Sequence, residues 1–213
     1  MKSYPKTYGP YSRFDGKEYH KYPAKVFGWA QPAFQYLKDV AWDYEEKLDG
    51  TGMRIIYDGV LKLLEVVGRT NKAEFPEKLI VFADDLLNYK LLKFIETFAD
   101  NNITFYGEGI GSGIQNGGNY GENRIVIFES RYNGKWMPKS VTNEWCELLG
   151  LEYIKCRGSA PLERCIDFVR QGVKSDYFDG FAEGLICRPS FPLYDSYGER
   201  IVCKIKHKDF YGV

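Results

Sequence analysis

The sequence predicts an α+β fold of antiparallel strands with helices at the periphery. Runs of β-branched and aromatic residues, such as residues 53–57 and 124–128, are typical of strands. Asp58-Gly59 and Asn133-Gly134 accept the positive φ of a hairpin turn. Apolar residues at helical spacing lie between these runs. With 213 residues, 44% of them hydrophobic, the chain can bury a substantial core without disulfides, and we expect a single core.

The expected elements follow in chain order. Residues 1–30, dense in Tyr, Lys, Pro and Gly, predict an extended aromatic and basic arm that packs by its rings. Pro161 and Gly172 suit the first turn and the end of a helix over residues 161–171. The other helices are expected at residues 33–40, 76–88, 89–100 and 142–149. Strands are expected at residues 42–46, 53–57, 60–67, 103–106, 124–128, 183–188 and 200–206.

Charge and cysteine usage limit the classes of function. The formal net charge is zero and the pI is about 6.7, so any nucleic-acid site must be a local patch. No apolar run is long enough to span a membrane and no signal peptide is evident, so we expect a cytoplasmic protein. The five cysteines show no CxxC spacing and predict reduced, mostly buried thiols. With two histidines in unrelated contexts, a metal would be held by oxygen.

The first cluster that carries chemistry is a Lys-x-Asp-Gly tetrapeptide. Lys47 directly follows the strand predicted at residues 42–46, Asp49-Gly50 makes a tight turn, and Arg54 lies on the returning strand. A lysine fixed on rigid elements, with cationic neighbours that lower its pKa, would offer a neutral amine that can attack phosphorus. By itself, such a tetrapeptide is more often a solvated lysine beside a turn.

Two further clusters offer groups that can bind a nucleotide. Arg69 follows an apolar strand, where it could bind an anion or a ribose and phosphate, although it also fits a surface turn. Glu108 stands among glycines, where its carboxylate could accept hydrogen bonds from ribose hydroxyls and the backbone could approach the nucleotide. The glycine-rich loop that follows has no lysine at Walker spacing and is therefore not a P-loop.

Phe128 and the last two strands complete the candidate residues. Phe128 is either a core ring or a platform on which a base stacks. Glu183 begins the strand over residues 183–188. Lys204 and Lys206 lie on one face of the last strand, because side chains alternate with a period of two. If that face points inward, a triphosphate between the two ammonium groups explains them; if it points outward, they are ordinary edge-strand charges.

The order of these clusters resembles the six-motif series of the covalent nucleotidyltransferases, which include DNA ligases, RNA ligases and mRNA capping enzymes. The series KxDG, strand-end arginine, YGE, aromatic strand, EGL and KIK is more specific than its parts and spans Trp42 to Phe210. Two stretches resemble phage-type RNA ligases in particular: Glu46-Lys47-Leu48-Asp49-Gly50-Thr51, which looks like their EKxxGT motif, and Ile114-Gln115 with Gly117-Gly118-Asn119-Tyr120. The chain thus resembles an ATP-dependent RNA ligase in a minimal form without a C-terminal domain.

The resemblance implies a fold and a role for each candidate residue. Residues 31–213 would form a nucleotidyltransferase (adenylation) domain, with two stacked antiparallel sheets around a nucleotide cleft and helices outside, similar to ATP-grasp-like ligases. Lys47 would form the lysyl-AMP, and Glu183 would position a metal-bound water or the ribose. The remaining roles would be adenine contact by Glu46 and stacking by Phe128, ribose or phosphate contact by Arg54 and Arg69, ribose binding by Glu108, and α-phosphate binding by Lys204 and Lys206.

The implied activity joins RNA ends, as in RNA repair. ATP would donate AMP to the lysine, AMP would pass to an RNA 5′-phosphate, and a 3′-hydroxyl would displace AMP. Mg²⁺ or Mn²⁺ would neutralise the phosphates through oxygen ligands. A partner protein that supplies further RNA-binding function remains an open alternative, and no membrane is expected to take part.

Two departures from the family pattern keep other functions open. Many phage-type RNA ligases carry asparagine at the position of Gly52, where it is linked to the RNA-dependent steps, and DNA ligases usually carry arginine there. Many relatives also have a C-terminal domain that helps to bind nucleic acid. The alternatives are a minimal DNA ligase, an RNA guanylyltransferase, or an inactive module that binds nucleotide or RNA.

The N-terminal arm is a hypothetical RNA contact. Its lysines and arginine interleave with tyrosines, which suits phosphate contact and base stacking. The alternative is an arm that packs on the domain with solvated lysines. The residues concerned are Lys2, Lys6, Arg13, Lys17, Lys21 and Lys25, with Tyr4, Tyr8, Tyr11, Tyr19 and Tyr22.

Overall fold

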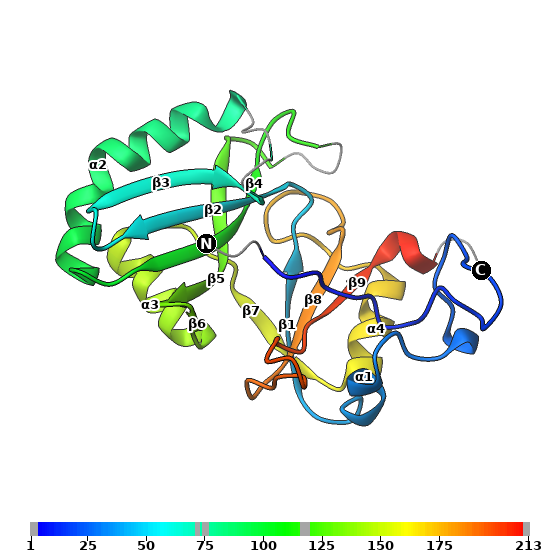
Figure 1. Cartoon of the computed structure of the whole chain (residues 1–213). Coiled ribbons are helices and arrows are strands. Elements are labelled where there is room, and N and C mark those ends of the chain that lie inside the picture. The colour runs from blue at the N-terminus through cyan, green and yellow to red at the C-terminus, as the bar shows by residue number, and fades with distance from the viewer. Residues whose placement is uncertain (1–3, 71–72, 74–76, 116–119, 211–213) are drawn as a thin grey trace. The chain divides into compact units, whose positions relative to one another are not determined.

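The protein divides into two compact units, each with its own antiparallel sheet (Figure 1). The computed structural model describes residues 4–70, 73, 77–115 and 120–210. Unit 1 comprises Met1–Tyr4 and Asp49–Ile154, and unit 2 comprises Pro5–Leu48 and Lys155–Val213. Two antiparallel sheets with helices confirm the predicted α+β class. The expected single core is wrong, because buried apolar residues form two separate clusters, one in each unit.

Unit 1 contains a five-stranded sheet in the order β3-β2-β4-β5-β6, with every neighbouring pair antiparallel. Figure 1 shows the long helix α2 lying along this sheet. Its core is formed by one face of the sheet together with α2 and α3. The elements are β2 (Thr51–Asp58), β3 (Leu63–Gly68), η2 (Glu77–Leu79), α2 (Ile80–Phe98), β4 (Ile103–Ile110), β5 (Arg124–Tyr132), β6 (Lys135–Trp136) and α3 (Lys139–Leu149).

Helix α2 replaces the two helices expected at residues 76–88 and 89–100. No glycine or proline interrupts the chain between Ile80 and Phe98, so nothing in the sequence ends the first helix. Its buried residues lie on one side of the helix along its whole length: Ala83, Leu86, Phe94 and Phe98. Pro76, where the first helix was expected to begin, lies outside the described residues.

The two predicted hairpin turns have different outcomes. Asn133 and Gly134 have φ values of 47° and 80°, and they join β5 to β6 as the predicted two-residue turn. The prediction at Asp58-Gly59 is wrong, because Asp58 pairs with Leu63 and the turn runs over residues 59–62. The Asp58 carboxylate accepts hydrogen bonds from the backbone of residues 60 and 61, at 3.0 Å each. This side-chain cap favours the longer turn.

Unit 2 contains a four-stranded antiparallel sheet in the order β7-β1-β8-β9. One face packs on α4 and forms the second core, which includes Trp42, Leu185 and Ile205. The elements are η1 (Lys25–Phe27), α1 (Pro32–Tyr36), β1 (Trp42–Lys47), β7 (Cys156–Ala160), α4 (Leu162–Gln171), β8 (Gly184–Pro189), β9 (Cys203–Lys206) and η3 (His207–Phe210).

Helix α4 follows its sequence pattern, whereas β7 does not. Leu162, Cys165, Ile166 and Val169 are buried on one face of α4, which ends at Gly172 as predicted. Strand β7 was not predicted, because Cys-Arg-Gly-Ser-Ala has no apolar alternation. Its strand geometry comes from pairing with β1, where Gly158 lies opposite Tyr44 and leaves room for that ring.

The structure also bears on the predictions for the cysteines and for a membrane span. All five cysteines are free thiols, and all but Cys156 are buried, which confirms the prediction. None of the helices in the described part of the chain combines the length and the apolar character that a membrane span requires.

Candidate active site

The predicted nucleophile Lys47 lies at the end of β1, in a row of residues that crosses the sheet of unit 2. Lys47 pairs with Gly184 on β8, and Gly184 pairs with Lys206 on β9. Both lysines therefore lie at the same end of the sheet, with a glycine between them. Trp42 and Tyr44 point into the α4 core, so by strand alternation Lys47 points to the opposite face. Lys204 and Lys206 share that face, since Cys203 and Ile205 are in the core.

Glu183 joins the two lysines through its carboxylate. Its Oε1 accepts a hydrogen bond from Lys206 Nζ at 2.5 Å, and its Oε2 accepts one from Lys47 Nζ. The side chains of Lys47, Glu183 and Lys206 are 19%, 11% and 21% exposed, so the group is shielded but open to a ligand. Residues 136 apart in the sequence thus meet in one charged cluster.

The cluster carries a net positive charge. Burial alone would raise the pKa of Glu183, but the two ammonium groups outweigh burial and hold that pKa below its ordinary value. Glu183 therefore stays ionised at neutral pH. Two lysines and one carboxylate leave one positive charge, and Lys204 lies on the same face. Such a surface suits a phosphate group.

Gly184 makes this arrangement possible because it puts no side chain between the lysines. A Cβ atom at Gly184 would lie 1.9 Å from the Ile205 carbonyl oxygen and 2.9 Å from the Cα of Lys206. Both contacts are with the backbone of β9, which cannot turn away as a flexible side chain can. The EGL motif therefore requires its glycine for close strand packing.

We expect Gly184→Ala to lower the free energy of unfolding by about 1–3 kcal/mol, the usual cost of overpacking. It should also shift β9 and its lysines, because the close contacts are with the backbone of that strand. Urea denaturation would measure the loss of stability. Gly9→Ala is the matched control, since a Cβ there meets only the Lys204 carbonyl oxygen at 3.8 Å. Equal stability of the two variants would contradict the packing argument.

Glu46 lies on the opposite face of β1 from Lys47. Its carboxylate accepts hydrogen bonds from Ser175 Oγ at 2.6 Å and from the Asp176 backbone N–H at 2.7 Å. Burial raises the pKa of Glu46, and these two hydrogen bonds oppose that rise. The side chain therefore ties β1 to the segment after α4. A role beside the adenine stays a prediction.

Four other predicted site residues gather on one face of the sheet in unit 1. Met53, Ile55 and Tyr57 face the core, so their neighbours on β2 face the other way. Arg54 is one of these neighbours; it is 1% exposed and donates from Nε to the Gly68 carbonyl at 3.0 Å. The other three members of this face are Arg69, Glu108 and Phe128.

Register and packing place two of these side chains, Glu108 and Arg69. Glu108 on β4 pairs with Gly52, one of the residues that face away from the core. The aliphatic part of Arg69 lies over the same glycine, with its Cβ 3.3 Å from the position that a Gly52 Cβ would take. A side chain at residue 52 would therefore displace Arg69.

Phe128 occupies a bulge in β5 and belongs to an aromatic group. Its ring lies 5.1 Å from that of Tyr4, which in turn lies 5.4 Å from Tyr106. Tyr106 is opposite Arg54 in the sheet, so the group lies on the face that carries Arg54. Phe128 is thus half-buried and outside the main core of unit 1, and its role as a platform for a base stays a prediction.

Tyr120, one residue of the loop motif, has a structural role that its place in the motif does not indicate. Its hydroxyl oxygen accepts a hydrogen bond from the backbone N–H of Asp49 at 3.0 Å. This contact holds the Lys-x-Asp-Gly turn against the glycine-rich loop. Gly50 fits there because a Cβ would lie 2.2 Å from the Gly109 carbonyl oxygen. An isolated aromatic residue in a glycine-rich loop was the available signal.

The fold and the placement of these residues define a class. One antiparallel sheet ends in a shielded lysine, with further lysines and a carboxylate beside it. A second sheet, in the other unit, carries arginines, an acid and an aromatic ring. This is the nucleotidyltransferase fold, which confirms the predicted fold class. The chain belongs to the RNA ligase family, whose family model matches residues 41–206. None of the curated protein sequences compared with the chain matches it.

Solved structures show the same fold. An archaeal ATP-dependent RNA ligase (form 2) aligns with a TM-score of 0.64 at 18% identity, covering 98% of this chain and 49% of that one. A mutant of the Naegleria gruberi RNA ligase with ATP and manganese aligns with a TM-score of 0.62 at 16% identity, covering 82% and 52%. The chain therefore spans about half the length of the structures it matches.

Proposed function

We propose that this protein is an ATP-dependent RNA ligase that forms a covalent lysyl-AMP on Lys47. The observation that carries the proposal is the shielded cluster in which Lys47 and Lys206 share the carboxylate of Glu183. Membership of the RNA ligase family supports RNA as the substrate. The solved relative with bound ATP and manganese supports ATP as the nucleotide.

The chemistry would proceed in three displacements at phosphorus. Lys47 Nζ attacks the α-phosphorus of ATP, a P–N bond forms, and pyrophosphate leaves. An oxygen of the RNA 5′-phosphate then attacks the same phosphorus and releases the lysine. Finally an RNA 3′-hydroxyl attacks the 5′-phosphorus, a phosphodiester forms, and AMP leaves. Such reactions depend mainly on positioning and charge neutralisation.

The residues of unit 2 would hold the reacting phosphates. Lys204 and Lys206 would bind the α-phosphate and stabilise the charge that develops on it. Attack requires the neutral amine. Lys47 must therefore lose a proton, break its ion pair with Glu183 and approach the α-phosphorus. Glu183 would then remain bound to Lys206 and keep that ammonium group in place.

The residues of unit 1 would bind the nucleoside. Glu108 would accept hydrogen bonds from the ribose hydroxyls, and Phe128 would stack on the adenine. Arg69, whose side chain lies over Gly52, would contact ribose or phosphate. Arg54, on the same face, would contact ribose or phosphate as well, while its Nε stays hydrogen-bonded to the Gly68 carbonyl. Glu46, on β1 of the other unit, would lie beside the adenine.

A divalent cation fits the donor set of this site. Glu183 offers carboxylate oxygens among the described residues of the cluster, and Mg²⁺ and Mn²⁺ prefer oxygen ligands. When bound, the cation would neutralise phosphate charge and favour loss of the proton from the lysine. The free thiols of all five cysteines agree with a reducing compartment, and we place the protein in the cytoplasm.

The decisive experiment incubates the purified protein with ATP or GTP labelled at the α-phosphate, with Mg²⁺ or Mn²⁺. We expect covalent label from ATP that survives denaturation and is removed by added pyrophosphate. Nicked RNA and nicked DNA duplexes would then be compared as substrates for sealing. Preference for GTP would indicate a guanylyltransferase, preference for DNA a DNA ligase, and absence of label an inactive binding module; each of these would contradict the proposal.

A further inference from the structure

The N-terminal arm is folded against unit 2, and only part of it remains available for a partner. Tyr8 pairs with Cys203, and its carbonyl accepts the Lys204 backbone N–H at 2.9 Å, so the arm continues the sheet beyond β9. Tyr11 is 4% exposed and packs in the core beside Trp29. Along this stretch the arm is extended and packs by its rings, in agreement with the prediction.

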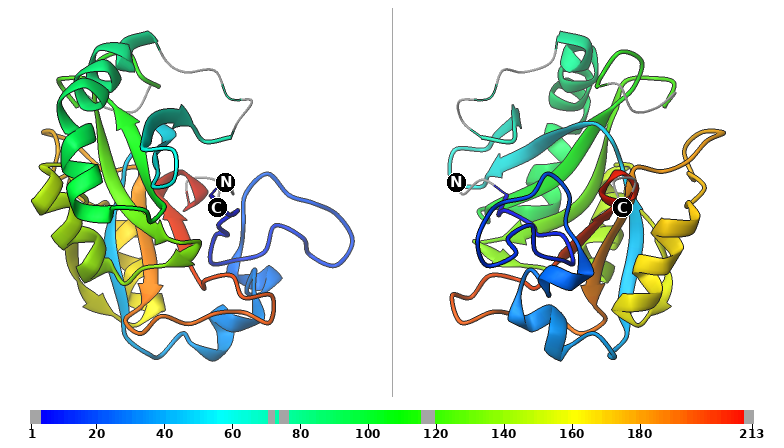
Figure 2. Two further views of the ribbon diagram at one scale, coloured as in Figure 1. Left: turned by 60° about the vertical axis from the view of Figure 1, so that its left-hand side comes forward. Right: turned by 90° about the vertical axis from the view of Figure 1, so that its right-hand side faces the viewer.

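Two of the arm's basic residues also have partners on the body of unit 2. Arg13 forms an ion pair with Asp209 on η3 at 3.0 Å, and Lys25 forms one with Glu163 on α4 at 3.0 Å. These contacts fix both sides of the loop that the arm makes. Figure 2 shows this loop, in blue, extending away from the sheet beside β9. The arm residues that remain for an RNA contact are thus fewer than the sequence alone suggested.

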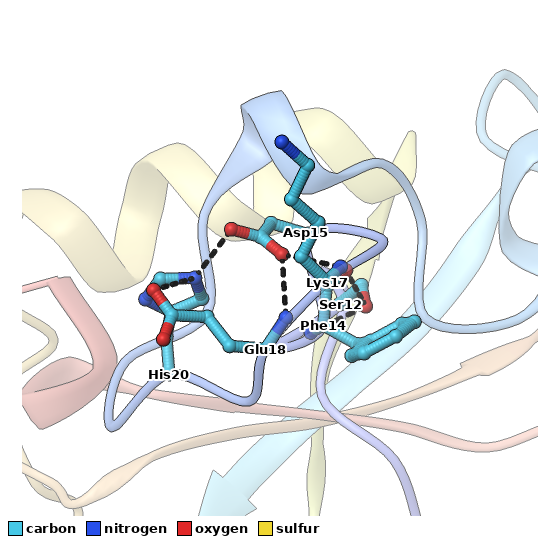
Figure 3. A network of polar contacts seen from close by, with 6 residues as sticks. All are labelled: Ser12, Phe14, Asp15, Lys17, Glu18 and His20. Atoms are coloured by element: carbon cyan, nitrogen blue, oxygen red, sulfur yellow. Dashed lines mark hydrogen bonds and ion pairs between the residues drawn. The ribbon is translucent and has the colours of Figure 1, made fainter.

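Residues 12–22, which we call the arm tip, form a hydrogen-bonded loop (Figure 3). The Asp15 carboxylate accepts bonds from the backbone of Lys17 and Glu18 at 2.8 and 2.9 Å, and contacts the His20 ring at 2.8 Å. The His20 ring stacks on Phe27 at 4.6 Å. The hydrogen bonds from Glu18, His20 and Lys17 lower the pKa of Asp15 to about 2, because they favour the charged carboxylate. The arm tip is therefore preorganised.

The arm tip presents aromatic rings and ammonium groups to solvent. Phe14 and Tyr19 pair through their backbones and are 51% and 75% exposed. Lys17 and Lys21 are exposed as well, and neither forms an ion pair with a carboxylate among the residues that the structure describes. Large exposed rings on a fixed loop, with cations beside them, are the features of a stacking platform for nucleic acid.

The arm tip is attached at the end of the sheet that carries the candidate active site. Lys47, Gly184 and Lys206 lie in one row at one end of the sheet. Asp209, which holds Arg13, follows Lys206 by only three residues on η3. The arm tip is thus attached at the same end of the same sheet, next to the strand that carries Lys204 and Lys206.

We propose that the arm tip binds unpaired RNA adjacent to the end that is being joined. Phe14 and Tyr19 stack on bases, and Lys17 and Lys21 contact phosphates. The two lysines favour RNA over a protein partner, because lysine is depleted at protein–protein interfaces but contacts phosphates in nucleic-acid complexes. This inference rests on the proposed ligase function, since it assigns a substrate-binding surface to that site.

The test compares two double variants with matched controls. Phe14→Ala/Tyr19→Ala removes the rings, and Lys17→Ala/Lys21→Ala removes the charges. Tyr36→Ala, on α1 with its side chain 82% exposed, and Lys155→Ala, exposed before the opposite edge strand β7, are the controls. Fluorescence anisotropy with a short 5′-phosphorylated single-stranded RNA, and with a blunt RNA duplex, measures binding.

We expect the ring variant to bind single-stranded RNA about 10-fold or more weakly, given the usual contribution of a stacked base. The lysine variant should also bind more weakly, with a salt dependence reduced by about 0.7 per lost phosphate contact. Phe14→Trp/Tyr19→Trp should restore affinity, because stacking needs a ring of any type. The controls should bind as the unmodified protein does.

Self-adenylylation by the same preparations separates this inference from the proposed function. We expect the arm-tip variants to take label from ATP at the normal rate, which also shows that they are folded. Labelled variants with unchanged RNA affinity would overturn the arm-tip inference and leave the ligase proposal intact. Equal loss of affinity for the blunt duplex would overturn the assignment to unpaired bases. An unmodified protein that takes no label would instead contradict the proposed function.

Discussion

Lys47→Arg is expected to abolish covalent labelling by ATP while leaving the protein folded. The guanidinium group keeps the positive charge and can still pair with Glu183, but it does not lose a proton at accessible pH and cannot attack phosphorus. Labelling with α-phosphate-labelled ATP, followed by denaturing electrophoresis, measures the effect. Thermal denaturation should show a melting temperature close to that of the unmodified protein.

Lys38→Arg provides the control for Lys47→Arg, because Lys38 belongs to the same unit and precedes the start of β1, whereas Lys47 lies at its end. This variant should label normally. Label on the Lys47→Arg protein would mean that another residue is the nucleophile, and peptide mapping would then identify it.

Glu183→Gln is expected to slow self-adenylylation by about 100-fold, the typical effect of removing one group that stabilises charge in an active site. The amide keeps the size of the side chain but removes the charge that holds Lys47 and Lys206 together. Single-turnover labelling rates at saturating ATP measure this loss. Because the two lysine side chains remain about one fifth exposed, the cost in stability should be below the about 3–5 kcal/mol found for fully buried pairs.

The same variant should change how stability depends on pH. The pKa of Glu183 is lower in the folded protein than in the unfolded chain, so its contribution to stability is complete at neutral pH. That contribution is lost as the pH falls through the ordinary range for a glutamate, about pH 4, towards the lowered value. Glu183→Gln should therefore lose less stability between pH 6 and pH 3 than the unmodified protein, in urea titrations at each pH. Parallel curves would show that the carboxylate is not stabilised by the lysines.

The chemistry of the candidate site was more predictable than its geometry. Lys47, Glu183, Lys204 and Lys206 were identified from residue types and their order, and alternation along β9 placed the last two on one face. Which face that is depends on where the core lies. The packing of Cys203 and Ile205 against α4 decides that the lysines point to the face that carries Lys47.

Glu46 illustrates what a linear motif leaves open. It adjoins Lys47 in the sequence, yet the two side chains point to opposite faces of β1, and Ser175 and Asp176 bind the Glu46 carboxylate. Neighbours in a strand cannot share a face, because the side-chain period is two. Its partners belong to a segment 129 and 130 residues away, and no local pattern indicates them.

The sequence by itself determined the features that depend on local spacing. These are the buried face of α4, the turn at Asn133-Gly134, the free cysteines and the series of chemical motifs that identified the family. Only the tertiary structure decided the division into two cores, the existence of β7, the contact between Tyr120 and the Asp49 backbone, and the meeting of Lys47, Glu183 and Lys206. The physical reason is that these features arise from strand pairing between distant segments, and the register of such pairs is fixed by burial of whole faces.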